Sequence, residues 1–400
     1  MTATAVRAQQ DTYAPLELFA IDRLLTQDER DIAATVRKFV DTRLKPQVAD
    51  WFESGSLPRE LAREFGELGL LGMHLDGYGC AGTNAVSYGL ACMELEAGDT
   101  GLRSFVSVQG SLSMYSIHRY GSDEQKDEWL PRLARGEAIG CFGLTEADFG
   151  SNPAGMRTRA RRDGSDWVLN GTKMWITNGN LADVATVWAQ TDEDSGGIRG
   201  FLVPTDTPGF SANVIHKKLS LRASVTSELV LDNVRLPESA RLPLAEGLGA
   251  PLSCLNEARF GIVFGTMGAA RDCLETTLAY TRDREVFDRP LSSFQLTQEK
   301  LANMTVELGK GVLLAIHLGR IKDAEGVRPE QVSLGKLNNV REALAIAREC
   351  RTLLGGSGIT LEYCPLRHAN NLESVLTYEG TSEMHLLSIG KALTGQPAFR

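Results

Sequence analysis

The segment SVLTYEGTSEMHLL, residues 374–387, places one carboxylate, Glu379, between a tyrosine and a glycine. Apolar side chains lie on both sides of it, at Leu376 and at Met384. A carboxylate buried among such residues without a partner costs free energy, so its presence there needs an explanation. Two interpretations stay open: a solvated turn, or a carboxylate with a chemical role.

A second charge, Arg103, stands among small, apolar and hydroxyl residues in ELEAGDTGLRSFVSVQGS, residues 94–111. If this stretch is buried, the guanidinium needs an anion. Glu96 lies about two helical turns earlier, on a similar face, provided that the helix is unbroken through Gly98 and Gly101. The pair could simply hold helices together, or Arg103 could wait in a pocket for the carboxylate of a ligand.

Two further stretches contain groups suited to a planar heterocycle. In CFGLTEADFGSNPAG, residues 141–155, hydroxyls and backbone N–H groups beside glycines could bind a polar ring edge, or the stretch could be a domain hinge. KMWITNG, residues 173–179, puts Trp175 and Thr177 on one side of a strand. An indole with a neighbouring hydroxyl suits a stacked ring, although a core tryptophan is the commoner outcome.

The phosphate candidates are RDREVFDRPLSSFQ, residues 282–295, and LLGGSGI, residues 353–359. Arg284 is permanently charged and can grip a pyrophosphate, and the glycines let backbone approach a phosphate. They do not fit the dinucleotide fingerprint, because no strand precedes them. The alternatives are a solvated arginine and a glycine-rich helix end.

The apolar pattern predicts three regions that would position these groups. Residues 1–140 repeat apolar side chains at three- and four-residue steps, with Thr26 and Glu29 as a capping box. Residues 141–248 alternate β-rich runs with Asp-Gly and Asn-Gly turns, and an Asp-Asn turn signal follows Leu231. Residues 249–400 return to long helical periods. The fold class is therefore α+β and multi-domain: a helical domain, a central β domain and a helical bundle.

The composition narrows the possible functions. The chain has 400 residues and a net charge of −9 without a basic block, which argues against nucleic-acid binding. No apolar run is long enough to span a bilayer, and the first twenty residues show no secretory signal. Seven cysteines and six histidines are scattered without ligand spacing, so neither a metal site nor a disulfide framework is predicted. We expect a cytoplasmic location.

Taken together, the motifs resemble the acyl-CoA dehydrogenase family over essentially the whole chain, and within it the members that act on glutaryl-CoA. The motifs that carry the resemblance are GYGCAG, GLRS before SVQGSL, GCFGLTE, LSLRAS, LNEARFGI, RHANNLESVLTYEGT and GKALTG. The resemblance implies an N-terminal helical domain, a central β-barrel and a C-terminal four-helix bundle. It also implies FAD bound between domains and subunits of a homotetramer.

The resemblance assigns FAD contacts residue by residue. In one subunit they are Phe142, Leu144, Thr145, Gly150, Ser151, Trp175, Ile176, Thr177 and, for a phosphate oxygen, Thr381. From a neighbouring subunit they are Arg284, Phe287, Gln295, Thr352, Leu353, Leu354, Gly355 and Gly356. Two motifs depart from the family: RxQFG reads REVFD here, and the glutamine often found before xxGGxG is Thr352.

For the acyl-CoA substrate, the resemblance makes Glu379 the base that removes the proton next to the thioester carbonyl. Its backbone N–H and a ribityl hydroxyl of FAD would form the oxyanion site. The CoA chain would meet Ser151, Leu252, Asn256 and Arg259. The remaining substrate contacts would be Glu96, Arg103, Ser104, Ser107, Tyr378 and Gly380, with Arg103 selecting a distal carboxylate.

The implied reaction is FAD-dependent oxidation and decarboxylation of glutaryl-CoA to crotonyl-CoA and CO2, with electrons passing to an electron-transfer flavoprotein. Three alternatives stay open. The chain could dehydrogenate another short-chain or dicarboxylyl acyl-CoA without decarboxylation, it could be a flavin-free scaffold of the same fold, or it could use oxygen directly, as acyl-CoA oxidases do.

Overall fold

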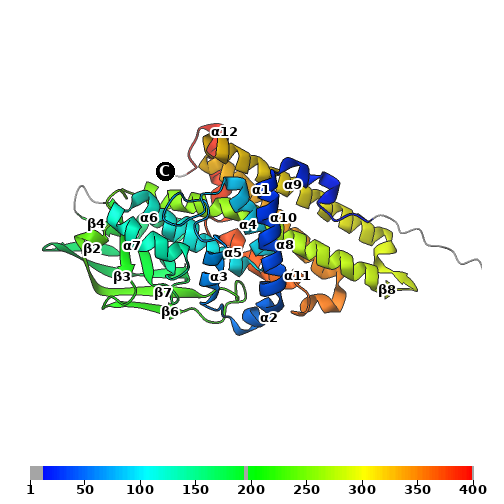
Figure 1. The fold of residues 1–400 in the computed structure, drawn as a ribbon, viewed down its shortest axis with the longest axis horizontal. Coiled ribbons are helices and arrows are strands. Elements are labelled where there is room, and N and C mark those ends of the chain that lie inside the picture. Colours follow the sequence, from blue (N-terminus) through cyan, green and yellow to red (C-terminus); the bar gives the residue numbers. More distant parts are fainter. Residues whose placement is uncertain (1–11, 193–196, 399–400) are drawn as a thin grey trace, which may run out of the picture.

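The computed structural model describes residues 12–192 and 197–398, and it confirms the predicted fold class of helical domain, central β domain and helical bundle (Figure 1). Residues 1–11, on which part of the signal-peptide expectation rests, lie outside the described residues. The β domain lies at one end of the molecule in Figure 1, and the β8 hairpin lies at the other. β1 begins at Gly140 and α8 at Gly249, next to the predicted domain limits.

The N-terminal region is helical, and its first long helix begins at the predicted capping box. Thr26 Oγ1 accepts from the Glu29 N–H at 3.3 Å, and Glu29 Oε2 accepts from the Thr26 N–H at 2.8 Å. The elements are the 3₁₀ turns η1 (Glu17–Phe19) and η2 (Ile21–Leu24), the π turns η3 (Val40–Leu44) and η4 (Val108–Met114), and helices α1 (Gln27–Phe39), α2 (Lys45–Ser54), α3 (Leu61–Glu67), α4 (Ala85–Gly98), α5 (Thr100–Ser107), α6 (Tyr115–Tyr120) and α7 (Asp123–Ala134).

The helix that the sequence analysis required to be unbroken between Glu96 and Arg103 is interrupted. α4 ends at Gly98, Asp99 is extended with φ −165°, and its side chain caps the start of α5 by accepting from the Gly101 N–H at 2.7 Å. A Cβ on Gly101 would lie 2.0 Å from a backbone carbonyl oxygen of the β domain. The break therefore lets α5 approach the β domain closely.

The central region is a curled sheet with its own apolar core. Its strands are β1 (Gly140–Gly143), β2 (Arg159–Asp163), β3 (Asp166–Thr177), β4 (Val184–Thr191), β5 (Gly197–Pro204), β6 (Phe210–Val214) and β7 (Thr226–Pro237), in the order β1-β4-β2-β3-β7-β6 with β5 on β4. Two short 3₁₀ turns accompany them, η5 (Pro153–Gly155) and η6 (Glu238–Ala240). The strands bury alternating apolar side chains such as Trp167, Phe201 and Leu229 between them.

The turn predicted after Leu231 is wrong, because β7 continues through it as a bulge. Asn233 takes φ 53°, and the register shifts by one residue against β3. The Asn170 side chain accepts from the Asn233 N–H at 2.9 Å, which satisfies the displaced backbone.

The C-terminal region contains the long helices of a bundle. They are α8 (Gly249–Asp283), α9 (Gln295–Glu325), α10 (Pro329–Leu353), α11 (Pro365–Thr377) and α12 (Ser382–Thr394), with the hairpin β8 (Glu285–Val286) and β9 (Arg289–Pro290) and the turns η7 (Leu291–Ser293) and η8 (Gly355–Ile359). Helix α9 alone among the described helices is long and apolar enough to cross a membrane, with half of its most apolar window buried in the protein. A core helix of a bundle passes the same test, so this is weak evidence for a span.

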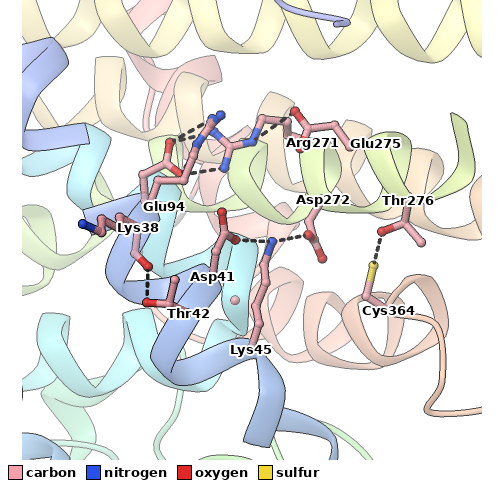
Figure 2. A network of polar contacts seen from close by, with 12 residues as sticks. Lys38, Asp41, Thr42, Lys45, Glu94, Arg271, Asp272, Glu275, Thr276 and Cys364 are labelled. Carbon is pink, nitrogen blue, oxygen red and sulfur yellow. Dashed lines mark hydrogen bonds and ion pairs between the residues drawn. The ribbon is translucent and has the colours of Figure 1, made fainter. Parts of the chain in front are cut away.

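Ion pairs, one of them buried, join the N-terminal helices to α8 (Figure 2). Glu94 of α4 accepts from both terminal nitrogens of Arg271 at 2.6 and 2.7 Å, and Lys45 lies between Asp41 and Asp272 at 2.9 and 2.7 Å. Burial acts to raise the pKa of Glu94, but the neighbouring guanidinium groups outweigh it and hold the pKa below its usual value. These contacts fix α4 relative to α8. Helix α4 carries Glu96, and α8 passes close to Arg103.

Candidate active site

The connection between α11 and α12 presents Glu379 in a strained backbone. Glu379 takes φ 54°, in the left-handed region that disfavours side chains, and Gly380 takes φ 96°. Three consecutive carbonyl oxygens of this connection are held by cations. Arg259 Nε donates to Glu379 O at 2.6 Å, and Lys336 Nζ donates to Tyr378 O at 2.7 Å and to Gly380 O at 2.8 Å. The surrounding helices thereby fix the conformation that aims the carboxylate.

The environment of the Glu379 carboxyl group raises its affinity for a proton. Its Oε2 is buried and has no hydrogen-bond partner among the residues that the structure describes. Burial raises the pKa of Glu379 above its usual value, although the positive charges of Arg103, Lys336 and Arg259 act in the opposite direction. The interpretation of this segment as a solvated turn is therefore wrong.

Arg103 is fully buried and engages two partners without using all its donors. Its Nε donates to Glu96 Oε2 at 2.7 Å, Nη2 donates to the Tyr378 hydroxyl, and Nη1 has no partner within the described residues. Glu96 also accepts from Thr100 Oγ1 at 3.0 Å. The internal Glu96–Arg103 ion pair considered from the sequence exists, and the Nη1 atom of the guanidinium remains available as a donor.

Several buried polar atoms on α5, on α8 and at Glu379 lack partners in the described part of the chain. They are Arg103 Nη1, Ser104 Oγ, Ser107 Oγ, Asn256 Oδ1 and Glu379 Oε2. We call these five residues the polar cluster. Each unpaired buried group costs about 1–3 kcal/mol, so a concentration of them indicates a place prepared for a polar ligand. A hollow of about 440 Å³ that lies elsewhere, between α9 and α10, is lined by none of the five.

Helix α8 passes close to Glu96 at Gly265, and this contact supports a stability prediction. A Cβ on Gly265 would lie 2.2 Å from Glu96 Oε2 and 3.3 Å from Arg103 Nε. We expect Gly265→Ala to displace the buried pair and lower the free energy of unfolding by about 1–3 kcal/mol, measured by urea denaturation. Gly390→Ala in α12 is the matched control, because no described atom lies within 4 Å of its added Cβ; it should be neutral or stabilising. Equal stability of Gly265→Ala and the parent would refute the close contact.

The structure brings the two heterocycle candidates together. The N–H of Met174 in β3 donates to the carbonyl of Thr145, which follows β1, at 2.8 Å. Trp175 sits at a register shift in β3 with φ 65°, and 59% of its surface is exposed, so the alternative of a core tryptophan is wrong. Ile176 is buried and Thr177 is half-buried beside it.

Hydrogen bonds of Glu146 hold the loop after β1. Glu146 accepts from the backbone N–H groups of Arg157 and Thr158 at 2.6 and 2.9 Å, and Lys173 Nζ donates to its Oε1 at 2.8 Å. Burial lowers the pKa of Lys173 to about 8, against the opposing influence of Glu146. The predicted residues of β1 and this loop differ in exposure: Phe142 and Leu144 are buried, Thr145 is half-buried, and Gly150 and Ser151 are exposed.

The phosphate candidates lie in two places, in the connection between α8 and α9 and at the end of α10 with η8. Phe287 is 86% exposed on the hairpin between α8 and α9, and Gly355 and Gly356 have no described atom within 4 Å of an added Cβ. Arg284, Gln295 and Thr352 are exposed, Leu353 is half-buried and Leu354 is buried. β8 and β3, the strand that carries Trp175, lie at opposite ends of the molecule in Figure 1.

The remaining predicted contacts lie near Glu379 or along α8. Thr381 caps α12, its Oγ1 accepting from the Met384 N–H at 3.4 Å. On α8, Leu252 is exposed and Asn256 is half-buried, while Arg259, predicted to meet the CoA chain, holds the Glu379 carbonyl.

Sequence reasoning missed three features. Lys336 has no local motif that points to it, and His385, whose Nδ1 lies 3.0 Å from Ser333 Oγ, packs beneath Gly380. Burial lowers the pKa of His385 to about 3, so its ring is neutral. Away from the polar cluster, possible ligand atoms of Cys273, Cys364 and His368 lie within 4.8 Å of one another, a grouping that the scattered sequence positions did not reveal.

Three family models match consecutive parts of the chain. They describe the acyl-CoA dehydrogenase N-terminal domain at residues 26–137, the middle domain at residues 141–234 and the C-terminal domain at residues 245–394.

Solved structures are similar over nearly the full length. A glutaryl-CoA dehydrogenase from Mycobacterium smegmatis in complex with FADH2 is 87% identical, with a TM-score of 0.96, 97% of this chain and 100% of that chain covered. A second glutaryl-CoA dehydrogenase structure from that organism is 71% identical, with a TM-score of 0.95 and the same coverage. A chain in a structure of the electron transferring flavoprotein of Acidaminococcus fermentans is 30% identical, with a TM-score of 0.89, 93% and 99% covered.

Proposed function

The chain belongs to the acyl-CoA dehydrogenase family, and we propose on this basis that it oxidises and decarboxylates glutaryl-CoA to crotonyl-CoA and CO2 with FAD. Its similarity to two glutaryl-CoA dehydrogenases at 87% and 71% identity supports the substrate. The observation that carries the proposal is the guanidinium of Arg103. It is fully buried, it touches the residue next to Glu379, and it keeps Nη1 without a partner in the described chain.

The exposed residues fit FAD. An indole that is 59% exposed beside a half-buried hydroxyl, Trp175 with Thr177, suits a stacked isoalloxazine ring. Arg284 with the open Gly355 and Gly356 suits a pyrophosphate. When bound, FAD supplies an acceptor for the hydride that leaves the β-carbon. The loop from Phe142 to Ser151 would line the ring.

The protein's own groups act on the α-hydrogen and on the far end of the acyl chain. Hydrogen bonds to the thioester oxygen make the α-proton acidic enough for removal, and Glu379 Oε2 takes it. Arg103 Nη1 and the hydroxyl of Ser104 would bind the distal carboxylate. A simple fatty acyl chain would leave Arg103 Nη1 without a hydrogen-bond partner, so the cluster favours a dicarboxylyl substrate.

Decarboxylation follows from the product of the oxidation. The new double bond is conjugated with the thioester, so the electron pair released as CO2 departs is delocalised onto the thioester oxygen. The terminal carbon then takes up a proton, and Glu379 holds the one removed from the α-carbon. The overall change is glutaryl-CoA to crotonyl-CoA and CO2, with two electrons passed on.

We extend the proposal to partners and location. The similarity to the A. fermentans structure supports an electron-transfer flavoprotein as acceptor. The separation of β3, which carries Trp175, from the hairpin of β8 and β9, which carries Phe287, supports a homotetramer in which a neighbouring subunit completes the cofactor site. Free thiols at all seven cysteines fit a reducing cytoplasm.

The function is tested by steady-state kinetics of the purified protein reconstituted with FAD. We expect a yellow protein that reduces an electron-transfer flavoprotein with glutaryl-CoA at a higher kcat/KM than with butyryl-CoA. Failure to bind FAD would favour the scaffold alternative, and stoichiometric peroxide release under air would favour an oxidase. Equal use of both substrates would favour a short-chain enzyme.

The raised pKa of Glu379 predicts the pH dependence. Only the ionised carboxylate accepts a proton, so kcat/KM should rise with pH along an acidic limb whose apparent pKa lies above the usual 4.5 of glutamate. The charge of Arg103 lowers this pKa, so Arg103→Met should move the limb to higher pH. Butyryl-CoA is the substrate for this comparison, because it has no distal carboxylate to lose. A limb that stays in place or moves to lower pH would contradict the assignment.

A further inference from the structure

Lys336 of α10 is a buried ammonium placed against the backbone of the catalytic connection. It is 1% exposed, and its Nζ lies 2.7 Å from Tyr378 O and 2.8 Å from Gly380 O. These two carbonyls stand on either side of Glu379. Burying a cation costs free energy. A buried ammonium that binds two backbone oxygens therefore indicates a role at this position beyond packing.

Because the peptide bond is planar, this contact also fixes the direction of the Glu379 N–H. The carbonyl of Tyr378 and the N–H of Glu379 belong to one planar trans unit, so they point in opposite directions. Because the oxygen is fixed on Lys336, the N–H must point away from α10. No described hydrogen bond uses this N–H. It is therefore a free backbone donor next to the Glu379 carboxyl group.

The charge of the ammonium also strengthens that donor. A cation bound to the carbonyl oxygen draws electron density from the amide, and hydrogen bonds in such a chain reinforce one another. Burial lowers the pKa of Lys336 to about 7, with Arg259 and Arg103 acting in the same direction and Glu379 opposing them. A neutral amine still has two N–H groups for the two carbonyls, so the aim of the peptide survives loss of the proton.

We infer that Lys336 is a positioning residue of the oxyanion site, which orients and polarises the Glu379 N–H toward the thioester oxygen of the acyl-CoA. The inference rests on the proposed function, because it needs a thioester in the cluster. Arg259, on the carbonyl of Glu379 itself, fixes the next peptide unit and leaves the N–H of Glu379 to Lys336.

The test is Lys336→Met in the FAD-loaded enzyme, because methionine keeps most of the length of the unbranched side chain and removes every donor. We expect kcat with glutaryl-CoA to fall about 10²–10³-fold, the usual cost of losing an oxyanion donor. The readout that a purely structural role would not move is the infrared carbonyl stretch of bound crotonyl-CoA labelled with ¹³C at the thioester. It should be lowered in the parent and return toward its free value in the variant. Lys336→Gln, which has one amide donor group and no charge, should be intermediate.

Lys218→Met is the matched control. Like Lys336, Lys218 donates to two backbone carbonyls, those of Leu221 and Ser224, at 2.9 and 2.7 Å. It is half-buried and lies in the connection between β6 and β7. It should leave the carbonyl stretch unchanged. If Lys336→Met does not hold FAD, Lys336→Gln carries the test.

A stretch that is equally lowered in the parent and in both Lys336 variants would overturn the inference, even if their rates fell. A parent enzyme that neither turns over glutaryl-CoA nor binds crotonyl-CoA would instead refute the proposed function, and the inference with it. The two failures are thus distinguishable.

Discussion

Glu379→Gln will lower the rate of flavin reduction by glutaryl-CoA by about 10⁴-fold, the upper end of what a general base contributes. Glutamine has the same shape and can keep the left-handed backbone of this position, but it cannot accept the α-proton. The unpartnered Oε2 makes Glu379 the strongest candidate for the acceptor in the polar cluster. Binding of FAD and of crotonyl-CoA should persist, because the cations that hold the connection use its backbone oxygens.

The measurement is anaerobic stopped-flow absorbance, with Glu383→Gln as the matched control. Glu383 is an exposed residue of α12, four positions away, and its substitution should leave the rate within a factor of two. Retention of more than a tenth of the parent rate in Glu379→Gln would show that another group removes the proton.

The same variant should be more stable than the parent near neutral pH. The folded pKa of Glu379 lies above its unfolded value, so the folded state loses stability as the pH rises above the unfolded pKa, and the loss is complete above the folded pKa. A neutral amide removes this cost, and the gain should vanish below the unfolded pKa. Urea denaturation at acidic and at neutral pH checks the sign, and a loss of stability at neutral pH alone would contradict it.

Arg103→Ala will lower kcat/KM for glutaryl-CoA by about 10²–10⁴-fold more than for butyryl-CoA. Removing one partner of a buried charge pair costs about 3–5 kcal/mol, and only a substrate with a distal carboxylate experiences that loss. The parent should prefer glutaryl-CoA to butyryl-CoA, because a butyryl chain leaves Arg103 Nη1 unpaired.

The substitution also strands the Glu96 carboxylate, which is fully buried. The double variant Arg103→Ala with Glu96→Gln removes that buried charge and separates folding from selectivity. It should recover stability in urea denaturation without recovering the preference for glutaryl-CoA. Equal losses on the two substrates in both variants would remove Arg103 from the role of selector.

The residues that could be found from the sequence are those whose type conflicts with their surroundings. Glu379 and Arg103 are charges whose immediate sequence neighbours are uncharged, and the structure buries Arg103 and the Oε2 atom of Glu379. The helices were visible through their apolar periodicity, and the start of α1 through Thr26 and Glu29. These signals are local in the sequence, so they can be recognised without a structure.

The features that escaped depend on distant parts of the chain. The Lys336 ammonium meets carbonyls 42 and 44 residues away, and backbone acceptors leave no mark in a sequence. The break at Asp99 reflects the approach of α5 to the β domain. The strand β7 runs through an Asp-Asn pair because the Asn170 side chain of β3 satisfies the bulge at Asn233. Tertiary contacts overrode local preference in each case.

One single-turnover experiment tests the central claim most directly: the parent enzyme and Glu379→Gln, both loaded with FAD, are mixed anaerobically with glutaryl-CoA that carries ¹³C in its free carboxylate. Flavin absorbance and labelled CO2 are followed together. We predict that the parent loses its flavin colour and releases about one equivalent of labelled CO2, while the variant does neither at a comparable rate. Bleaching without CO2, or equal bleaching by both proteins, would contradict the account.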